Sequence, residues 1–203
     1  APSLGELYYP YSGNPNLKPE RSTGWEAGLE QTLGPVVGEV TGFWNDIRDL
    51  INYNSATFQN ENIGRARTRG VEVAVRTAIG EKAFLRASYT YLDAEDVEAR
   101  APLIRRPRHR ASLTAGSGFG NGGSWSATGV FVGARPDLSA ADFTTPVESP
   151  SYVRLDAAVT LPPVVLSFSP WIRVTNLLGK EYAEVNGFPA PGRRFLAGLE
   201  ASF

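Results

Sequence analysis

Apolar and polar residues alternate at every second position in nine separate stretches of the chain. In the last stretch, Phe195, Leu199, Ala201 and Phe203 share one face with Ala197. Successive side chains of a strand point to opposite faces, so this period predicts strands with one apolar face. We expect an all-β fold without a helix. The predicted strands span 22–32, 37–50, 58–78, 84–91, 109–119, 124–134, 152–161, 166–175 and 193–203.

The connections between these stretches alternate between short and long. Short turns are expected at 33–36, 79–82, 120–123 and 161–164, and long connections at 51–57, 92–108, 135–150 and 177–192. Tight turns on one side and extended loops on the other are typical of outer-membrane barrels. The sequence has no apolar run near the roughly 18 residues of a membrane helix, but barrel strands need lipid-facing residues only at alternate positions. The pattern therefore predicts an antiparallel transmembrane β-barrel segment.

The two faces of the predicted strands differ in character. Tyr91 is expected at the outer end of the apolar face, and Phe119, Trp125 and Phe203 at the periplasmic end, as two interfacial aromatic girdles. The phase is ambiguous in 37–50 and 124–134, where apolar residues occupy both faces. The opposite face is expected to line a wide polar lumen. Its charged residues are Arg76, Arg86, Arg110, Arg154 and Arg173, with Glu26, Glu30, Glu72, Asp156 and Glu200.

The order of turns and loops also predicts an orientation. The ninth strand descends from a long loop, so the C-terminus is expected in the periplasm and residues 1–20 in an extracellular loop. Bacterial barrels of one chain have an even number of strands. Nine strands and a chain without methionine therefore suggest that upstream strands belong to the same protein.

Composition excludes several kinds of site. The chain has no cysteine and one histidine, His109, so thiol chemistry and multi-histidine metal sites are excluded, and neither a metal nor a cofactor is expected. Its 20 basic and 21 acidic residues provide no polycationic surface for nucleic acid. His109 lies between two arginines and no nucleophile motif accompanies it, so an enzyme is not expected. A soluble carbohydrate-binding sandwich or a small passive porin or adhesin would also be all-β, but the one-sided loops and the odd strand count argue against them.

Five motifs, in order along the chain, resemble the C-terminal half of the barrel of TonB-dependent outer-membrane transporters. The motifs are Asn14-Pro15-Asn16-Leu17-Lys18-Pro19-Glu20-Arg21-Ser22, Asn45-Asp46-Ile47-Arg48-Asp49-Leu50-Ile51, Asn62-Ile63-Gly64-Arg65-Ala66-Arg67-Thr68-Arg69-Gly70-Val71-Glu72, Val174-Thr175-Asn176-Leu177-Leu178-Gly179-Lys180-Glu181-Tyr182 and Pro191-Gly192-Arg193-Arg194-Phe195. The resemblance implies that residues 21–203 form the last nine of about 22 strands of a plugged barrel. The plug domain is not part of this sequence.

The resemblance also implies partners. A TonB energy-coupling complex would act through the plug, and the barrel would be surrounded by outer-membrane lipid and lipopolysaccharide. The terminal strand resembles the signal read by the barrel assembly machinery, with Phe195, Leu199, Ala201 and Phe203 as its apolar face. A lipid-facing strand without a signalling role is the alternative, and both roles are compatible.

Three groups of loop residues are candidates for ligand contact. Tyr8, Tyr9 and Tyr11 suit stacking on a flat ligand, with loop packing as the alternative. Arg105, Arg106 and Arg108 suit phosphate or carboxylate groups. These arginines follow an acidic stretch, 93–98, so the loop could instead neutralise its own charge or contact lipopolysaccharide. Phe188 is the third candidate.

The resemblance implies import of a scarce nutrient into the periplasm. The layout of 2–8, 14–17, 45–51 and 103–106 looks most like the cobalamin transporter branch of the family. Cobalamin is therefore the first expected substrate. A ferric siderophore or haem is the alternative.

Overall fold

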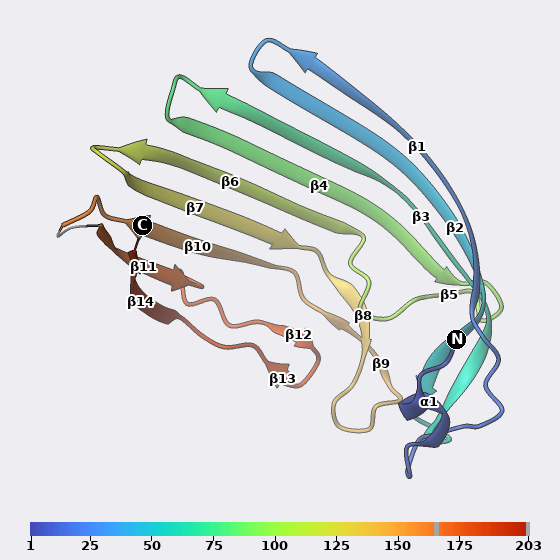
Figure 1. The fold of residues 1–203 in the computed structure, drawn as a ribbon. Coiled ribbons are helices and arrows are strands. Elements are labelled where there is room, and N and C mark those ends of the chain that lie inside the picture. Colours follow the sequence, from blue (N-terminus) through green and yellow to red (C-terminus); the bar gives the residue numbers. More distant parts are fainter. Residues whose placement is uncertain (165–166, 202–203) are drawn as a thin grey trace.

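The computed structural model describes residues 1–164 and 167–201. The chain forms one curved antiparallel sheet, with small hairpins and a short helix at one end (Figure 1). The elements are α1 (Leu4–Tyr8), β1 (Arg21–Leu33), β2 (Val36–Asn54), β3 (Gln59–Ile79), β4 (Ala83–Asp96), β5 (Ala101–Pro102), β6 (His109–Phe119), β7 (Gly123–Val132), β8 (Arg135–Leu138), β9 (Pro146–Ser149), β10 (Tyr152–Thr160), β11 (Phe168–Thr175), β12 (Ala183–Val185), β13 (Phe188–Pro189) and β14 (Arg194–Ala201).

Each long strand pairs with its neighbours in sequence. The order is β1-β2-β3-β4-β6-β7-β10-β11-β14, with β5 paired to β4. These nine strands overlap the nine predicted ranges, so the predicted all-β fold is confirmed. β2 and β4 continue to Asn54 and Asp96, four and five residues beyond their predicted ends. The positions predicted at 166, 202 and 203 lie outside the described residues.

The short turns gather at one end of the sheet and the long connections at the other (Figure 1). This arrangement agrees with the alternation predicted from sequence. Several of the long connections contain hairpins of their own, since β8 pairs with β9 and β12 with β13. The predicted polar loop at 51–57 is wrong in part. β2 and β3 remain paired as far as Asn54 and Gln59, because continued pairing satisfies backbone donors and acceptors that a loop would leave to water.

The expectation that the chain has no helix is wrong for residues 4–8. Ser3 caps α1, and its hydroxyl accepts from the backbone N–H of Glu6 at 3.2 Å. The Glu6 carboxylate accepts in return from the backbone N–H of Ser3 at 2.7 Å. This reciprocal capping box is visible in the sequence as Ser3-x-x-Glu6. No helix within the described residues has the length and apolar character to cross a membrane.

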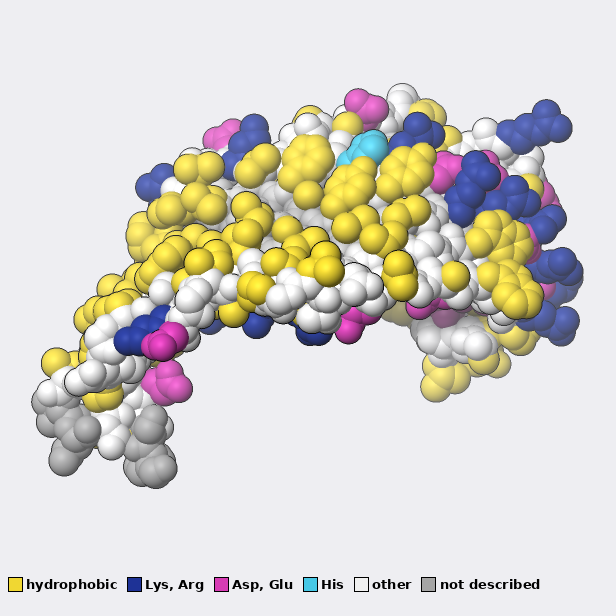
Figure 2. All heavy atoms as spheres, turned by 90° about the horizontal axis from the view of Figure 1, so that it is seen from above, with side chains coloured by type: hydrophobic (Ala, Val, Ile, Leu, Met, Phe, Trp, Pro, Cys, Tyr) yellow, Lys and Arg dark blue, Asp and Glu magenta, His cyan; other side chains and the backbone are white. Residues whose placement is uncertain are grey.

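The register places the apolar side chains of the sheet on its convex face. Leu29 of β1 lies opposite Val40 of β2, which lies opposite Val73 of β3. Figure 2 shows apolar side chains forming a broad surface over these strands. The register also resolves the two ambiguous segments. Phe43 and Val130 face the concave side, whereas Trp44 and Phe131 face the convex side.

Three aromatic rings of the concave face lie over a glycine of the neighbouring strand. A Cβ at Gly70 would lie 2.6 Å from the Phe43 ring and would also meet the Tyr91 carbonyl. The register continues through Gly70. β3 therefore has no bulge at Gly70, and the close approach comes from the Phe43 ring and the Tyr91 carbonyl. Aromatic rings compensate for the missing side chain of a strand glycine. The other two pairs are Phe84 with Gly116 and Trp171 with Gly198.

Replacing Gly70 by alanine should lower the free energy of unfolding by about 1–3 kcal/mol, because the new methyl group has no room beside Phe43. Gly38→Ala is the matched control, since a Cβ at Gly38 meets nothing within 4 Å. Urea unfolding of the refolded full-length protein in detergent measures both. Equal midpoints for the two variants would contradict the close packing at Gly70.

Candidate ligand-binding wall and outer loops

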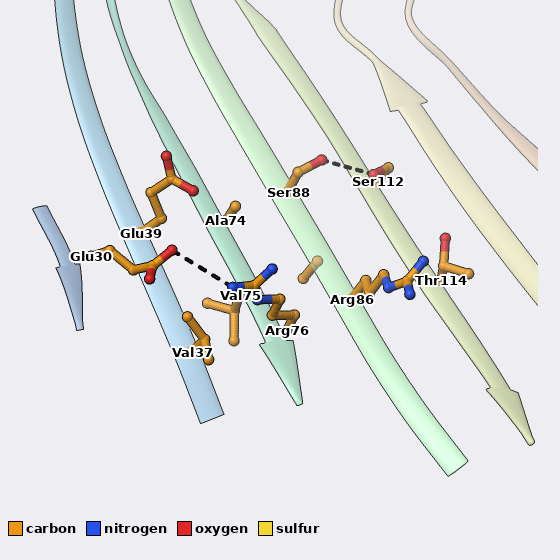
Figure 3. A pocket seen from close by; sticks show the side chains of 11 residues that line it. Glu30, Val37, Glu39, Ala74, Val75, Arg76, Arg86, Ser88, Ser112 and Thr114 are labelled. Carbon is orange, nitrogen blue, oxygen red and sulfur yellow. Dashed lines mark hydrogen bonds and ion pairs between the residues drawn. The ribbon is translucent and has the colours of Figure 1, made fainter. Parts of the chain in front are cut away.

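The concave face carries the charged residues that the sequence assigned to a lumen. Glu30 and Glu39 are paired across β1 and β2, and Glu39 lies opposite Ala74 of β3. A hollow of about 460 Å³ lies over β1 to β6 (Figure 3). Arg76 lies 3.7 Å from Glu30 in this hollow, and both side chains are more than half exposed. This ion pair is weak because water screens it, so the charges are available to an occupant of the concave side.

The charges on this face are unevenly distributed. Apart from Asp49 near the end of β2, the concave side of β1, β2 and β3 carries four glutamates and one arginine. Apart from Asp96 at the end of β4, the concave side of β4, β6, β7, β10 and β11 carries four arginines and one aspartate. A polar molecule or protein segment on this side would therefore meet an acidic and a basic half. The first group is Glu26, Glu30, Glu39, Glu72 and Arg76, and the second is Arg86, Arg110, Arg154, Arg173 and Asp156.

A buried carboxylate joins three of the long connections. Asp137 of β8 is 1% exposed. Its Oδ1 accepts from Arg105 Nε of the β4–β6 connection at 2.9 Å. Its Oδ2 accepts from the backbone N–H of Asn186, in the β11–β14 connection, at 2.8 Å, and from the Ser149 hydroxyl at 3.2 Å. The three connections therefore form one polar unit centred on Asp137.

A second buried side chain strengthens the same unit. The guanidinium of Arg135, 2% exposed, donates to the Ala183 carbonyl at 2.5 Å and to the Glu184 carbonyl at 3.1 Å. The Glu184 carboxylate accepts from the Tyr152 hydroxyl at 2.5 Å. Tyr152 stacks on Tyr182, with ring centroids 4.2 Å apart. The β8–β9 and β12–β13 hairpins are therefore held against the end of β10.

Hydrogen bonds also connect this unit to the tip of the β2–β3 hairpin. The Ser55 hydroxyl, in the β2–β3 turn, donates to the Phe143 carbonyl at 2.5 Å. Within the unit, Asn186 Oδ1 accepts from the backbone N–H of Ala140 at 3.2 Å. The Asn60 backbone N–H donates to the Ser12 carbonyl at 2.9 Å, so residues 1–20 lie on the same hairpin. Arg135 and Asp137 are not among the residues predicted from the sequence. Their partners are up to 49 residues away in the chain, so no local motif marks them.

The tyrosine candidates lie at the end of the sheet that carries the long connections. Tyr8, Tyr9 and Tyr11 are 67%, 58% and 83% exposed. The rings of Tyr9 and Tyr11 meet edge to face, with centroids 6.0 Å apart. Their loop is fixed to the sheet, since Asn14 Nδ2 donates to the Asn60 carbonyl at 2.9 Å. The candidates are therefore exposed aromatic rings on a supported loop.

The arginine candidates separate into two kinds. Arg105 donates a hydrogen bond to Asp137, whereas Arg106 and Arg108 have exposed side chains that make no such bond within the described residues. The interpretation of a loop that neutralises its own charge is wrong in part. Asp93 pairs with Arg69 at 2.9 Å and Glu95 with Arg67 at 3.3 Å, because these side chains are opposite one another across β3 and β4.

The remaining predicted residues lie in different places. Phe188 opens the two-residue strand β13 and is 57% exposed. Phe195, Leu199 and Ala201 share the convex face of β14, whereas Phe203 lies outside the described residues. No group of three or more metal-ligating side chains occurs within the described ranges 1–164 and 167–201.

The Asp137 unit should loosen in acid. Burial raises the pKa of Asp137, but hydrogen bonds from the backbone of Asn186 and Leu138 and from Arg105 outweigh burial and hold this pKa below its ordinary value. The carboxylate form accepts these bonds. Its stabilisation is therefore complete above the ordinary pKa and is lost as the pH falls through the lower folded-state value.

Asp137→Asn isolates this contribution. At pH 5 we expect pepsin to cleave 133–151 and 176–193 faster in the variant than in the full-length wild type, because a neutral amide at position 137 leaves Arg105 without its charged partner. The difference should shrink as the pH is lowered toward 2. A difference that is constant with pH would show that the charge of Asp137 is not the cause. Equal cleavage at pH 5 would show that Asp137 does not order these connections.

Comparison with known proteins identifies the family of this chain. A family model described as TonB dependent receptor-like, beta-barrel, matches residues 1–177. The solved copper transporter OprC has a TM-score of 0.81 at 19% identity, and the match covers 100% of this chain and 34% of that one. The ferric-catecholate import receptor Fiu of E. coli K12 has a TM-score of 0.72 at 22% identity, covering 99% and 30%.

A third solved structure is the ferripyoverdine receptor of the outer membrane of Pseudomonas aeruginosa. Its TM-score is 0.71 at 15% identity, and the match covers 90% of this chain and 27% of that one. This chain therefore spans about a third of the length of the solved structures that it matches. At these identities the likeness shows the fold, and the family model supplies the membership. The chain belongs to the TonB-dependent receptor-like β-barrel family, whose members are outer-membrane receptors.

Proposed function

We propose that this chain forms part of the wall of an outer-membrane active transporter, which binds a scarce nutrient outside the cell and imports it into the periplasm. The family match over residues 1–177 carries the proposal. The two faces of the sheet support it, because an apolar convex face suits lipid and a charged concave face suits a hydrated lumen. The plug and the strands that complete the barrel would come from sequence outside this chain, and the TonB complex would supply energy through the plug.

The orientation follows from the two ends of the sheet. The end with the long, mutually bonded connections would face the medium and collect ligand, and the end with the short turns would face the periplasm together with the C-terminus. Barrels of this kind have short periplasmic turns and longer extracellular loops. Residues 1–20 would then be an extracellular segment, and 21–203 the C-terminal part of the barrel.

Cobalamin is the first proposed cargo, on the sequence layout of 2–8, 14–17, 45–51 and 103–106. A ferric siderophore is the second, with haem as a further iron-containing candidate. The matched structures favour the second, since they are receptors or transporters named for copper, ferric catecholate and ferripyoverdine. All of these cargoes contain a metal, so the proposed class is a metal ion or a metal complex.

We propose two groups of loop residues for cargo contact. The exposed rings of Tyr8, Tyr9 and Tyr11 offer stacking surfaces, and Arg106 and Arg108 offer charged donors to carboxylate or phosphate groups. Arg105 acts through Asp137 and is therefore a positioning residue. Phe188 is a further apolar contact at the tip of the β12–β13 hairpin.

Uptake by the full-length protein tests both the function and the cargo. In cells that lack other receptors for these cargoes, we expect accumulation of labelled cobalamin, and none in cells without TonB. Ferric siderophores are the parallel arm, and import of them alone would replace cobalamin as cargo. Accumulation that is independent of TonB would indicate a passive porin and would overturn active transport. Binding without import would indicate an adhesin or a sensor.

Arg106→Ala with Arg108→Ala should weaken binding of the imported cargo to whole cells on the order of tenfold, because two charged hydrogen-bond donors are lost. Lys82→Ala is the control, since Lys82 lies in the short β3–β4 turn at the other end of the sheet. Binding that is unchanged in the double variant, or equally reduced in the control, would remove the arginines from the proposed site.

We also propose that the C-terminal strand carries the assembly signal. An exposed edge strand can add to another sheet by main-chain hydrogen bonds, with alternate side chains giving specificity. Deleting Phe203 should lower the amount of full-length protein that is folded in the outer membrane, measured by heat-modifiable migration in gels. Phe168→Ala on the neighbouring strand is the control. Equal assembly of the deletion variant and the wild type would leave Phe195, Leu199 and Ala201 as lipid-facing residues only.

A further inference from the structure

The hollow over β1 to β6 has an acidic side and a basic side. The register places Glu30 opposite Glu39, and Arg76 opposite Arg86. Figure 3 shows the two glutamates on the β1–β2 side of the hollow and Arg86 on the β4 side. Like charges directly opposite one another across strands are destabilising. Each pair therefore favours contact with a group of opposite charge.

One negative and one positive side chain of the hollow remain without an ionic partner. Arg76 lies 3.7 Å from Glu30. Glu39 and Arg86 are exposed and form no salt bridge within the described part of the chain. The Arg86 guanidinium carbon instead lies 4.9 Å from the centroid of the Phe84 ring. A cation held over an aromatic face keeps its N–H groups for other partners, so Glu39 and Arg86 are both available to an occupant.

The wall between these two charges is small and polar. Glu39 pairs with Ala74, and Ala74 pairs with Ser88. The Ser88 hydroxyl lies 2.8 Å from the Ser112 hydroxyl. Two hydroxyls that share one hydrogen bond retain a further donor and several acceptor lone pairs. The hollow of about 460 Å³ therefore combines two opposite charges with a floor that can form hydrogen bonds.

The separation of the two charges limits the size of the occupant. Glu39 on β2 aligns with Ser88 on β4, which lies two residues from Arg86. Two strand spacings and two residues correspond to about 12 Å between the Cα atoms of Glu39 and Arg86. Both side chains line the hollow and shorten this gap. An extended peptide advances roughly 3.3–3.6 Å per residue, so two or three residues would span the remaining distance.

We propose that this hollow binds the two termini of a dipeptide or tripeptide. The Glu39 carboxylate accepts from the peptide ammonium group, and the Arg86 guanidinium donates two parallel hydrogen bonds to the peptide carboxylate. Ser88 and Ser112 bond the peptide backbone between the termini.

The charge of the hollow matches such a zwitterion. Arg76 balances Glu30, and the remaining Glu39 and Arg86 balance one another, so an occupant without net charge leaves the hollow neutral. The peptide is a different ligand class from the metal or metal complex proposed as cargo. The site rests on the proposed function, because it needs a hydrated lumen. Its test measures equilibrium binding without uptake, so failure of peptide binding and failure of transport are separate results.

Isothermal titration calorimetry of the full-length protein in detergent tests the site with three probes. The probes are triglycine, N-acetyl-triglycine and triglycine amide, which differ only in the charge of one terminus. We expect triglycine to bind on the order of tenfold more tightly than either blocked form, because each block removes a charge-assisted hydrogen bond.

Two single variants assign the termini to their partners. Glu39→Gln should weaken triglycine binding about tenfold but leave the N-acetyl form unchanged, because the charge pair is already absent there. Arg86→Gln should have the same relation to triglycine amide. Arg173→Gln with Glu200→Gln is the matched control, since it removes one charge of each sign from the concave face of β11 and β14.

The outcomes that would overturn the proposal are distinct. Equal affinity of the wild type for the three probes would show that the termini are not recognised, and this comparison needs no variant to fold. An equal loss in the control, or unchanged triglycine binding in Glu39→Gln and Arg86→Gln, would remove the hollow as the site. Failure of the wild type to bind triglycine would also overturn it and would leave the hollow to a segment of the same protein.

Discussion

The apolar convex face is the constraint on which the rest of this structure depends. The long strands form a single sheet, and few of its apolar side chains are buried within the chain, with Leu29 and Phe195 each 69% exposed. A continuous apolar surface of this kind is unfavourable in water. Lipid removes that penalty, so the outer membrane takes the place that a second layer of secondary structure would have in a soluble domain. The backbone hydrogen-bonding groups do not depend on the lipid, because each inner strand pairs with a neighbour on both sides.

The same constraint divides the molecule into a wall, formed by the nine long strands, and a rim, formed by the long connections between them. In the wall, period two fixes which residues meet lipid and which meet the lumen, so the charged residues of the concave face follow directly. In the rim, burial comes from polar contacts, with Asp137 and Arg135 as the buried centres. A buried carboxylate is stable only when hydrogen bonds compensate for the loss of water. Four donors surround Asp137, and they come from three connections, so these connections are ordered together.

Sequence reasoning succeeded where the signal was local and periodic. The nine strands, the one-sided long connections and the lumen-facing charges all follow from alternation, because the pleat of a strand converts sequence parity into a face. Sequence reasoning failed at a polar strand end and for charged residues whose partners lie on another strand. Residues 51–57 are rich in asparagine, serine and threonine, which favours a loop, but β2 and β3 remain paired as far as Asn54. The acidic stretch near Asp93 was expected to balance Arg105, Arg106 and Arg108. Its partners are on β3 instead, since register decides which charges meet.

By itself, the sequence determined the fold class, the order of the strands, the two faces of the wall and the family. These properties depend on parity and on motifs that are contiguous in the chain. The tertiary structure alone decided how the rim is joined, which arginine of 105–108 binds Asp137, and which aromatic ring covers Gly70. The physical reason is that cross-strand register and long-range hydrogen bonds bring together residues as far as 88 positions apart, and no local pattern encodes those distances.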